Sequence, residues 1–437
     1  MKRILASWLV LTGMVAAQEA STLTAKIERE KEGLLGLYRH LHANPELSFM
    51  EEKTSARLAE EMRAVGFEVT EKVGGWGVVA VYKNGPGKTV LVRTDMDALP
   101  VRELTGLPFA SKVKTKDKEG NDVSVMHACG HDMHMSCWVG AAKTLLAIKD
   151  QWKGTLVFIG QPAEERGGGA GPMLKDGLYT RFPKPDACLA LHCAAEIPAG
   201  SLGMTYKGAT ASVDNVDIIV HGVGGHGAQP QATKDPVVLA AQIVLALQTV
   251  ASREVHPLDP VVVTVGSIHG GTKHNIISDQ VTLQLTIRTV DEKTRYQVLE
   301  AIKRIVRGQG ISAGLPEALL PEVKENDNYT PVLVNDDGVS KRLVTVFERR
   351  FGAERVRERK PTMGGEDFSR YGMTEDKIPI CMFWLGATPA AKVAEAAKLD
   401  QPLPSLHSPF FRPDAEPALV TGVEAMTMAV LDVLKQP

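Results

Sequence analysis

The chain has 437 residues, of which 44% are hydrophobic, and a formal net charge of −2 at pH 7. This length exceeds that of the usual single domain and can bury a large core. The near-balanced charge, with no basic run interleaved with aromatic residues, argues against a nucleic-acid-binding protein. We therefore expect a globular protein of more than one domain with a small-molecule partner.

The N-terminus has the pattern of a secretory signal. Lys2 and Arg3 precede an apolar stretch over residues 4–15, and Val15-Ala16-Ala17 fits a small-residue cleavage site. The stretch is shorter than the about 20 residues that span a bilayer, and we expect no membrane span in the mature protein. Residues 1–17 are predicted to be a cleavable signal peptide, which predicts a periplasmic or secreted location.

Strands and helices alternate over residues 24–208, which predicts an α/β/α sheet domain. Three apolar, β-branched segments read as buried strands, and each runs towards residues that can bind metal. These are 90–93 before Asp95 and Asp97, 155–160 before Glu164 and Glu165, and 187–191 before His192. Open α/β sheets bind ligands at the carboxyl ends of their strands, so these side chains are expected to converge.

Residues 126–134, Met-His-Ala-Cys-Gly-His-Asp-Met-His, hold a thiol, three imidazoles and a carboxylate. Such a mixture is typical of metal binding. Cys129 and His131 are two residues apart, which does not suit one helix face but suits a loop that turns at Gly130. A helix is expected from His131 onward, with His134 supporting the site or starting that helix. The alternative is a buried cysteine beside helix-start histidines.

Glu164 and Glu165 follow a predicted strand, and glycines follow them. In an extended chain, adjacent side chains point to opposite sides. One carboxylate could then bind metal while its neighbour accepts a proton from water. The alternative is an exposed acidic loop. The five cysteines form no obvious disulfide framework, and the three at 188, 193 and 381 are expected to be small apolar core residues.

The pattern changes over residues 209–322, where the order strand, helix, strand, strand, helix predicts an inserted α+β unit. Its strand at 281–288 alternates between apolar and polar residues, so one face is buried and the other carries Arg288. The α/β pattern resumes over residues 323–432. The sequence thus predicts an α/β domain split by a smaller domain.

The chain resembles the M20 family of metallopeptidases and amidohydrolases, in the branch of hippurate hydrolases, N-acyl-amino-acid deacylases and auxin-conjugate hydrolases. The matching motifs occur in the family's order: residues 93–100, 126–134, 161–165, 191–192, 364–368 and 407–409. The resemblance implies that the α/β/α domain, residues 24–208 and 323–432, is catalytic. It also implies that the inserted domain, residues 209–322, is a lid that mediates homodimerisation.

The resemblance also implies two divalent metal ions, zinc or manganese, with cobalt or nickel as alternatives. The implied metal ligands are Cys129, His131, Glu165, His192 and His407. Glu164 would be the general base acting on a metal-bound water, and Asp97 would orient a ligand. From the lid, His226 would stabilise the oxyanion, and Asn275 and Arg288 would hold the substrate's carboxylate.

Three positions depart from the family pattern: Gln231 near His226, Arg166 after the glutamate pair, and Ser278 before Asp279. None removes an implied ligand or the base, but they leave substrate preference open. The expected reaction is hydrolysis of the amide bond of an N-acyl amino acid or small peptide with a free carboxylate. The alternatives are a dipeptidase or carboxypeptidase, a non-catalytic ligand-binding member of the same fold, and an enzyme acting on a carbamoyl or amidino nitrogen.

Overall fold

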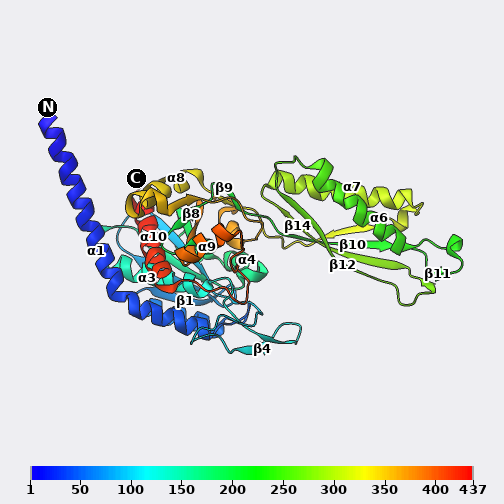
Figure 1. The fold of residues 1–437 in the computed structure, drawn as a ribbon, viewed down its shortest axis with the longest axis horizontal. Helices are drawn as coiled ribbons and strands as arrows, with labels where there is room; N and C mark the ends of the chain where they lie inside the picture. The colour runs from blue at the N-terminus through cyan, green and yellow to red at the C-terminus, as the bar shows by residue number, and fades with distance from the viewer. Residues whose placement is uncertain (1, 436–437) are drawn as a thin grey trace. The chain divides into compact units, whose positions relative to one another are not determined.

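The computed structural model describes residues 2–435, with side chains described from residue 23 onward (Figure 1). The side chains of the predicted signal peptide therefore lie outside the described part. Chain contacts divide the protein into two compact units, each described here by itself. Unit 1 comprises Met1–Lys207, Asn335–Lys360 and Arg370–Pro437, and unit 2 comprises Gly208–Val334 and Pro361–Ser369.

The return to unit 1 comes later in the chain than the expected boundary at residue 323. The reason is a strand over Glu322–Glu325, which pairs antiparallel with the first strand of unit 2 and so stays with that unit. The short segment Pro361–Ser369 also belongs to unit 2, which the sequence did not indicate.

Unit 1 is built on an eight-stranded mixed sheet of order β1-β2-β6-β3-β7-β18-β8-β17. The strands are β1 (Glu68–Val73), β2 (Gly77–Lys83), β3 (Thr89–Asp95), β6 (Thr155–Gln161), β7 (Ala187–Pro198), β8 (Leu202–Met204), β17 (Val356–Glu358) and β18 (Ile380–Thr388). The central strands β6, β3, β7 and β18 are parallel to one another. Their carboxyl ends therefore meet at one edge of the sheet, as the sequence predicts.

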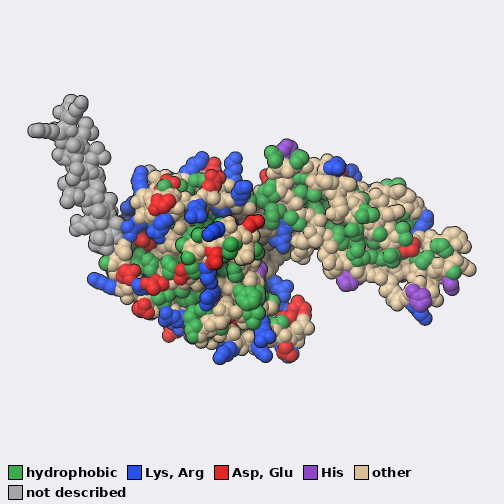
Figure 2. Space-filling model, viewed as in Figure 1, with side chains coloured by type: hydrophobic (Ala, Val, Ile, Leu, Met, Phe, Trp, Pro, Cys, Tyr) green, Lys and Arg blue, Asp and Glu red, His purple; other side chains and the backbone are tan. Residues whose placement is uncertain are grey.

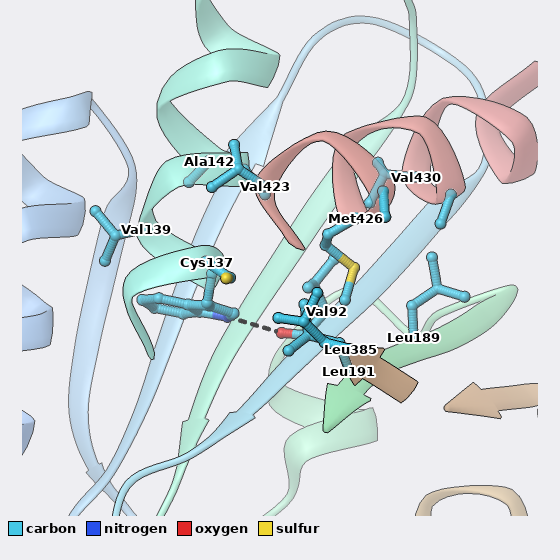
Figure 3. Packing of buried hydrophobic residues seen from close by; sticks show 14 of the residues in the cluster. Val92, Cys137, Val139, Ala142, Leu189, Leu191, Leu385, Val423, Met426 and Val430 are labelled. Atoms are coloured by element: carbon cyan, nitrogen blue, oxygen red, sulfur yellow. Dashed lines mark hydrogen bonds between the residues drawn. The ribbon is translucent and has the colours of Figure 1, made fainter. Parts of the chain in front are cut away.

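Helices cover this sheet. They are α1 (Lys2–Ala43), α2 (Glu52–Val65), α3 (His131–Ala147), α4 (Ala170–Lys175), α5 (Leu178–Arg181), α8 (Asp337–Phe351), α9 (Ala390–Leu399) and α10 (Ala415–Lys435). Figure 3 shows α3 and α10 packed over the sheet, where Trp138 Nε1 donates a hydrogen bond to the Val92 carbonyl at 3.0 Å. Glycine lets the helices approach closely. A Cβ atom at Gly140 of α3 would lie 2.4 Å from Val423 of α10.

Unit 2 contains a four-stranded antiparallel sheet of order β12-β14-β10-β15, with two helices packed on it. Its elements are β10 (Asp214–His221), α6 (Pro236–Thr249), β12 (Val261–Gly270), β14 (Gln280–Thr289), α7 (Glu292–Ser312) and β15 (Glu322–Glu325). Alternate residues of β14 are buried against the helices. The predicted βαββα order, and with it the fold class, is confirmed.

Short strands complete the chain. They are β4 (Lys114–Lys116) paired with β5 (Asp122–Ser124), β11 (Gly225–His226) paired with β13 (Ile276–Ile277), and β9 (Lys207–Thr210) and β16 (Leu333–Asn335) at the crossings between units. Among the described residues, two helical stretches are long and apolar enough to span a bilayer, Pro236–Glu254 and Ala415–Lys435. The sequence analysis expected none. α10 fits a core helix instead, because 67% of its apolar window is buried in the fold.

Candidate metal centre

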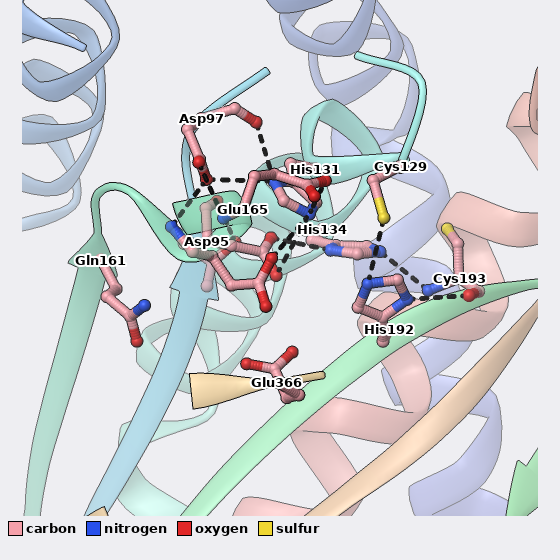
Figure 4. Close-up of polar contacts among 12 residues, drawn as sticks. Asp95, Asp97, Cys129, His131, His134, Gln161, Glu165, His192, Cys193 and Glu366 are labelled. Carbon is pink, nitrogen blue, oxygen red and sulfur yellow. Dashed lines mark hydrogen bonds and ion pairs between the residues drawn. The ribbon is translucent and has the colours of Figure 1, made fainter. Parts of the chain in front are cut away.

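The loop before α3 brings Cys129 and His131 to the carboxyl edge of the sheet (Figure 4). Gly130 between them has φ +86°, a left-handed conformation that glycine adopts without strain. A Cβ atom there would lie 3.1 Å from the sulfur of Cys193. Gly130 thus allows the sharp turn that places the thiol in the loop and the imidazole at the first residue of the helix.

Backbone carbonyls orient two of the histidines. His131 Nδ1 donates to the carbonyl of Asp97, and His192 Nδ1 donates to the carbonyl of Cys193, both at 2.8 Å. Each ring therefore carries a proton on Nδ1, which leaves Nε2 as the nitrogen that can bind a metal. His192 Nε2 lies 3.5 Å from the sulfur of Cys129.

His134 is placed differently. Its Nδ1 lies 2.8 Å from Asp95 Oδ1, and its Nε2 accepts a 2.8 Å hydrogen bond from the backbone N–H of Cys193. By position, His134 belongs to a group of possible donors with Asp95, His131 and His192. Because both of its ring nitrogens are already engaged, we assign His134 to orienting Asp95 and the backbone at Cys193 rather than to metal binding.

The two glutamates lie on a single 3-10 turn, Glu164–Arg166, and not on extended chain as the sequence analysis assumed. Asp97 explains the turn, because its carboxylate accepts the backbone N–H groups of both Glu164 and Glu165, at 3.1 and 3.0 Å. The residue before the turn, Ala163, has φ +52°, and its N–H is accepted by Glu51 at 2.7 Å. The turn sends both glutamate side chains to the same side.

Both glutamates therefore approach one imidazole. His131 Nε2 lies 3.8 Å from Glu165 Oε1 and 4.0 Å from Glu164 Oε2, and Asp95 Oδ2 is 3.7 Å from the same nitrogen. His131 Nε2 and Glu165 Oε1 are buried without hydrogen-bond partners among the described residues. Burial alone would lower the pKa of His131, but Asp95, Asp97 and Glu165 raise it to about 10.

These observations test whether the residues fit a metal. Donor atoms of Cys129, His131 and Glu165 lie within 4.8 Å of one another. A thiol, an imidazole and a carboxylate form a donor set that suits a divalent transition metal. The carboxylates of Asp95, Glu164 and Glu165 around His131 Nε2 favour positive charge at this point. The site therefore fits the divalent ions that the resemblance implies.

His407 comes from the loop before α10 and is the most exposed of the predicted ligands, at 55%. Its backbone has φ +67°, and its N–H donates to the carbonyl of Ala128, in the loop that carries Cys129. Its Nε2 lies 3.4 Å from Glu165 Oε2. The structure thus brings His407 to the glutamate turn although 242 residues separate it from Glu165 in the sequence.

Three further residues support the site, and of these only Asp95 is predicted from the sequence, as a residue that can bind metal at a strand end. Asp95 bonds His134 and also pairs with the buried guanidinium of Arg93 at 2.8 Å. Glu51 supports Ala163, and burial together with Asp97 raises the Glu51 pKa to about 8. His42 lies between Asp132 and Glu103, at 2.6 and 2.9 Å. No sequence motif marks Glu51 or His42.

The three predicted lid residues lie in unit 2. His226 is exposed on β11, where its backbone pairs with Ile276, and the carbonyl of Asn275 accepts the N–H of Gly227. Arg288 lies on β14, half-buried, and donates to the carbonyl of Met363 at 3.0 Å. His226 therefore lies on the two-stranded element and Asn275 in the turn just before its strand β13, while Arg288 projects from the main sheet of the unit.

The model of peptidase family M20/M25/M40 matches residues 91–430. Thermostable carboxypeptidase 2 of Saccharolobus solfataricus is 37% identical over 82% of this chain and 87% of its own length. Hippurate hydrolase of Campylobacter jejuni is 39% identical over 76% and 82%. The crystal structure of a dinuclear metal-binding M20 peptidase from Bacillus subtilis superposes with a TM-score of 0.76 at 28% identity, covering 94% of this chain and all of that one.

Proposed function

The chain belongs to peptidase family M20/M25/M40, and on this premise we propose that it hydrolyses the amide bond of N-acyl amino acids or small peptides with a free carboxylate. The observation that carries the proposal is the convergence of Cys129, His131 and Glu165 beside a second buried carboxylate, Glu164. The similarity to a hippurate hydrolase supports an N-acyl amino acid as substrate. The similarity to a carboxypeptidase supports a small peptide as the second candidate.

The proposed ligands of two divalent ions are Cys129, His131, Glu165, His192 and His407. When bound, such ions polarise a carbonyl group and lower the pKa of water. The ions are proposed to be zinc or manganese, because a mixed sulfur, nitrogen and oxygen donor set suits zinc without excluding manganese, cobalt or nickel. Metal analysis of the purified protein would identify them.

Glu164 is the proposed general base. It accepts the proton of the attacking water and delivers it to the nitrogen of the leaving amine. Asp97 supports this role, because its carboxylate holds the backbone N–H groups of Glu164 and Glu165 and so fixes the turn. Asp97 also orients His131 through its own carbonyl.

The lid residues are proposed to recognise the substrate. His226 would donate a hydrogen bond to the oxyanion, a contribution that can reach several kcal/mol of transition-state stabilisation. Asn275 and Arg288 would bind the α-carboxylate, since a guanidinium suits planar, bidentate carboxylate recognition. The exposure of His226, and the position of Asn275 just before the strand that pairs with the His226 strand, support this assignment.

The reaction is tested with hippurate, N-acetyl amino acids, indole-acetyl amino acids and dipeptides, each with added zinc or manganese. Glu164→Gln is expected to lower kcat by about 10²–10⁴-fold or more while metal binding is kept. Glu358→Gln, on the exposed end of β17, is the matched control and should keep full activity. A variant at Glu164 with unchanged kcat, or a wild-type protein that binds no metal, would overturn the proposal.

We further propose that the protein is exported, with cleavage after Ala17. The support is the charged, apolar and small-residue pattern of residues 2–17. Expression of the full chain followed by N-terminal sequencing of the extracytoplasmic fraction should give a mature chain that begins at Gln18. Recovery of the uncleaved chain in the cytoplasm alone would contradict export.

A further inference from the structure

Unit 1 has a cavity apart from the metal centre, with a volume of about 340 Å³. Its walls come from the end of α1, residues 107–109, the start of α9 and the loop over residues 403–415. None of the metal-donor residues lines it. The volume lies at the lower end of the range of about 300–1,000 Å³ in which proteins bind small molecules.

The walls combine rings with positive charge. The apolar part includes Tyr38, Phe109, Phe410 and Phe411, and the rings of Tyr38 and Phe109 meet edge to face at 5.9 Å. The charged part holds three exposed cations, Arg39, Lys392 and Arg412, against a single carboxylate, Asp414. Within the described part of the chain, none of the three cations forms an ion pair.

Tyr38 is an enclosed part of this wall. Its side chain is 1% exposed, and its hydroxyl is buried without a hydrogen-bond partner among the described residues. The hydroxyl is therefore closed off from the cavity, and Tyr38 contributes its ring to the wall. The cations are complementary to an anionic acceptor, while the rings are complementary to an apolar body.

Phe411 separates this cavity from the loop that carries Cys129. A Cβ atom at Gly130 would lie 3.4 Å from the ring of Phe411, so the ring packs directly behind the turn. The same ring lines the cavity on its other side. A ligand in the cavity would therefore lie behind the Cys129 loop.

We propose that this cavity binds a small carboxylate with an apolar or aromatic body, at a site separate from the metal centre. Arg39 and Arg412 face the carboxylate, because guanidinium groups pair well with planar carboxylates. The phenylalanine rings cover the body. This binding does not depend on the proposed amide hydrolysis.

The test is calorimetric titration of the metal-loaded full-length protein with phenylacetate. Phenylacetamide lacks the charge, acetate lacks the ring, and inorganic phosphate is an anion without an apolar body. Phenylacetate is expected to bind at least about tenfold more tightly than each of these three. No phenylacetate binding up to about 10 mM, or equal binding of phosphate, would overturn the proposal.

Variants of the cavity residues distinguish binding in this cavity from binding at the metal centre. The double variant Arg39→Gln/Arg412→Gln should weaken phenylacetate binding at least about tenfold. Arg349→Gln, on the exposed face of α8, is the matched control and should change it less than about twofold. Unchanged affinity in the double variant would place the ligand elsewhere and overturn the proposal.

Discussion

At the scale of single residues, a buried network of charged side chains supports the site, and no sequence motif predicts it. The imidazole of His42 lies between the carboxylates of Asp132 and Glu103, and all three side chains are almost fully buried. Asp132 also accepts the N–H of Met133 in the first turn of α3. The network therefore ties the start of α3, next to His131, to α1 and to the loop at residue 103.

Substitution of His42 tests this network. Burial alone would lower the His42 pKa, but hydrogen bonds with Asp132 and Glu103 raise it to about 10. His42→Ala leaves two buried carboxylates unpaired and should lower the free energy of unfolding by about 3–5 kcal/mol at pH 7. The stabilisation is fully present below the unfolded-state pKa of 6.5 and is lost as pH rises through the folded-state pKa, so the difference from wild type should shrink towards pH 10.

Urea unfolding at pH 7 and pH 9.5 measures this effect. His40→Ala, two residues away on the exposed side of α1, is the control and should change stability little. A loss in His42→Ala that is the same at both pH values would show that packing, and not charge, is what His42 contributes.

Glu51 shows the same sign of pH dependence in a lower pH range, because its pKa is also raised in the folded state. Burial, followed by the nearby Asp97, raises its pKa from 4.5 to about 8. The folded state therefore holds a proton on this carboxyl between about pH 4.5 and 8 that the unfolded chain releases, and stability falls as pH rises across that interval. Glu51→Gln removes this dependence while keeping an acceptor for the Ala163 N–H.

The expected result is that Glu51→Gln gains stability relative to wild type as pH rises from 5 to 8.5, by on the order of a few kcal/mol. Chemical unfolding at the two pH values provides the measurement, with the exposed neighbour Glu52→Gln as the control. If the difference between Glu51→Gln and wild type were independent of pH, the carboxyl would not be protonated in the folded protein.

At the scale of elements, the helix layer depends on glycines where helices cross. A Cβ atom at Gly140 of α3 would lie 2.4 Å from Val423 and 2.9 Å from Leu34. Gly140→Ala should therefore destabilise the protein by about 1–3 kcal/mol, as overpacking does. Gly36 of α1 has no atom within 4 Å of such a Cβ, so Gly36→Ala should stabilise it by about 0.5–1 kcal/mol.

Each variant adds one methyl group to a helical glycine, at a helix crossing in one case and in open space in the other. The difference between their thermal stabilities therefore measures the effect of the close helix crossing. Destabilisation in both variants would mean that α1 packs differently along its length. Equal stabilisation in both would mean that α3 and α10 can separate without loss.

The elements also show how far the sequence could predict the site. Strand periodicity and parallel order place residues from β3, β6 and β7 at one sheet edge, and the structure has them there. The predicted extended conformation of the two glutamates was wrong. Asp97, 67 residues before Glu164 in the sequence, determines the turn by accepting its backbone hydrogen bonds. The His42 network was missed for the same reason, since its partners lie 61 and 90 residues away in the sequence.

At the scale of the whole molecule, unit 2 has a surface that suits a second copy of the chain. β12 is an edge strand of ten residues whose outer side is unpaired in the described chain. α6 packs Leu239, Ile243 and Leu247 on the core but leaves Leu245 73% exposed. Hydrophobic side chains are gathered on the face of unit 2 in view (Figure 2). A long, unprotected edge beside an apolar helix face is typical of a surface that pairs.

We propose that two copies form a homodimer through β12 and α6. Pairing of two β12 edges would satisfy backbone groups that otherwise face solvent, and Leu245 would become buried. The double variant Leu245→Glu/Ile268→Lys places charges on the helix and on the strand, where both residues are now exposed, and should shift the protein to monomers. Ile311→Lys, exposed at the end of α7, is the matched control and should leave the dimer intact.

Sedimentation equilibrium over a range of protein concentrations measures the association. The wild type should fit a dimer of about twice the 47.2 kDa chain mass, less any cleaved signal peptide, and the double variant should fit a single chain. The introduced charges lie at exposed positions. The thermal stability of the double variant should therefore differ from that of the wild type only by the stabilisation that dimer formation contributes. A monomeric wild type, or a double variant that remains dimeric, would show that the exposed β12 edge and the Leu245 face do not pair in solution.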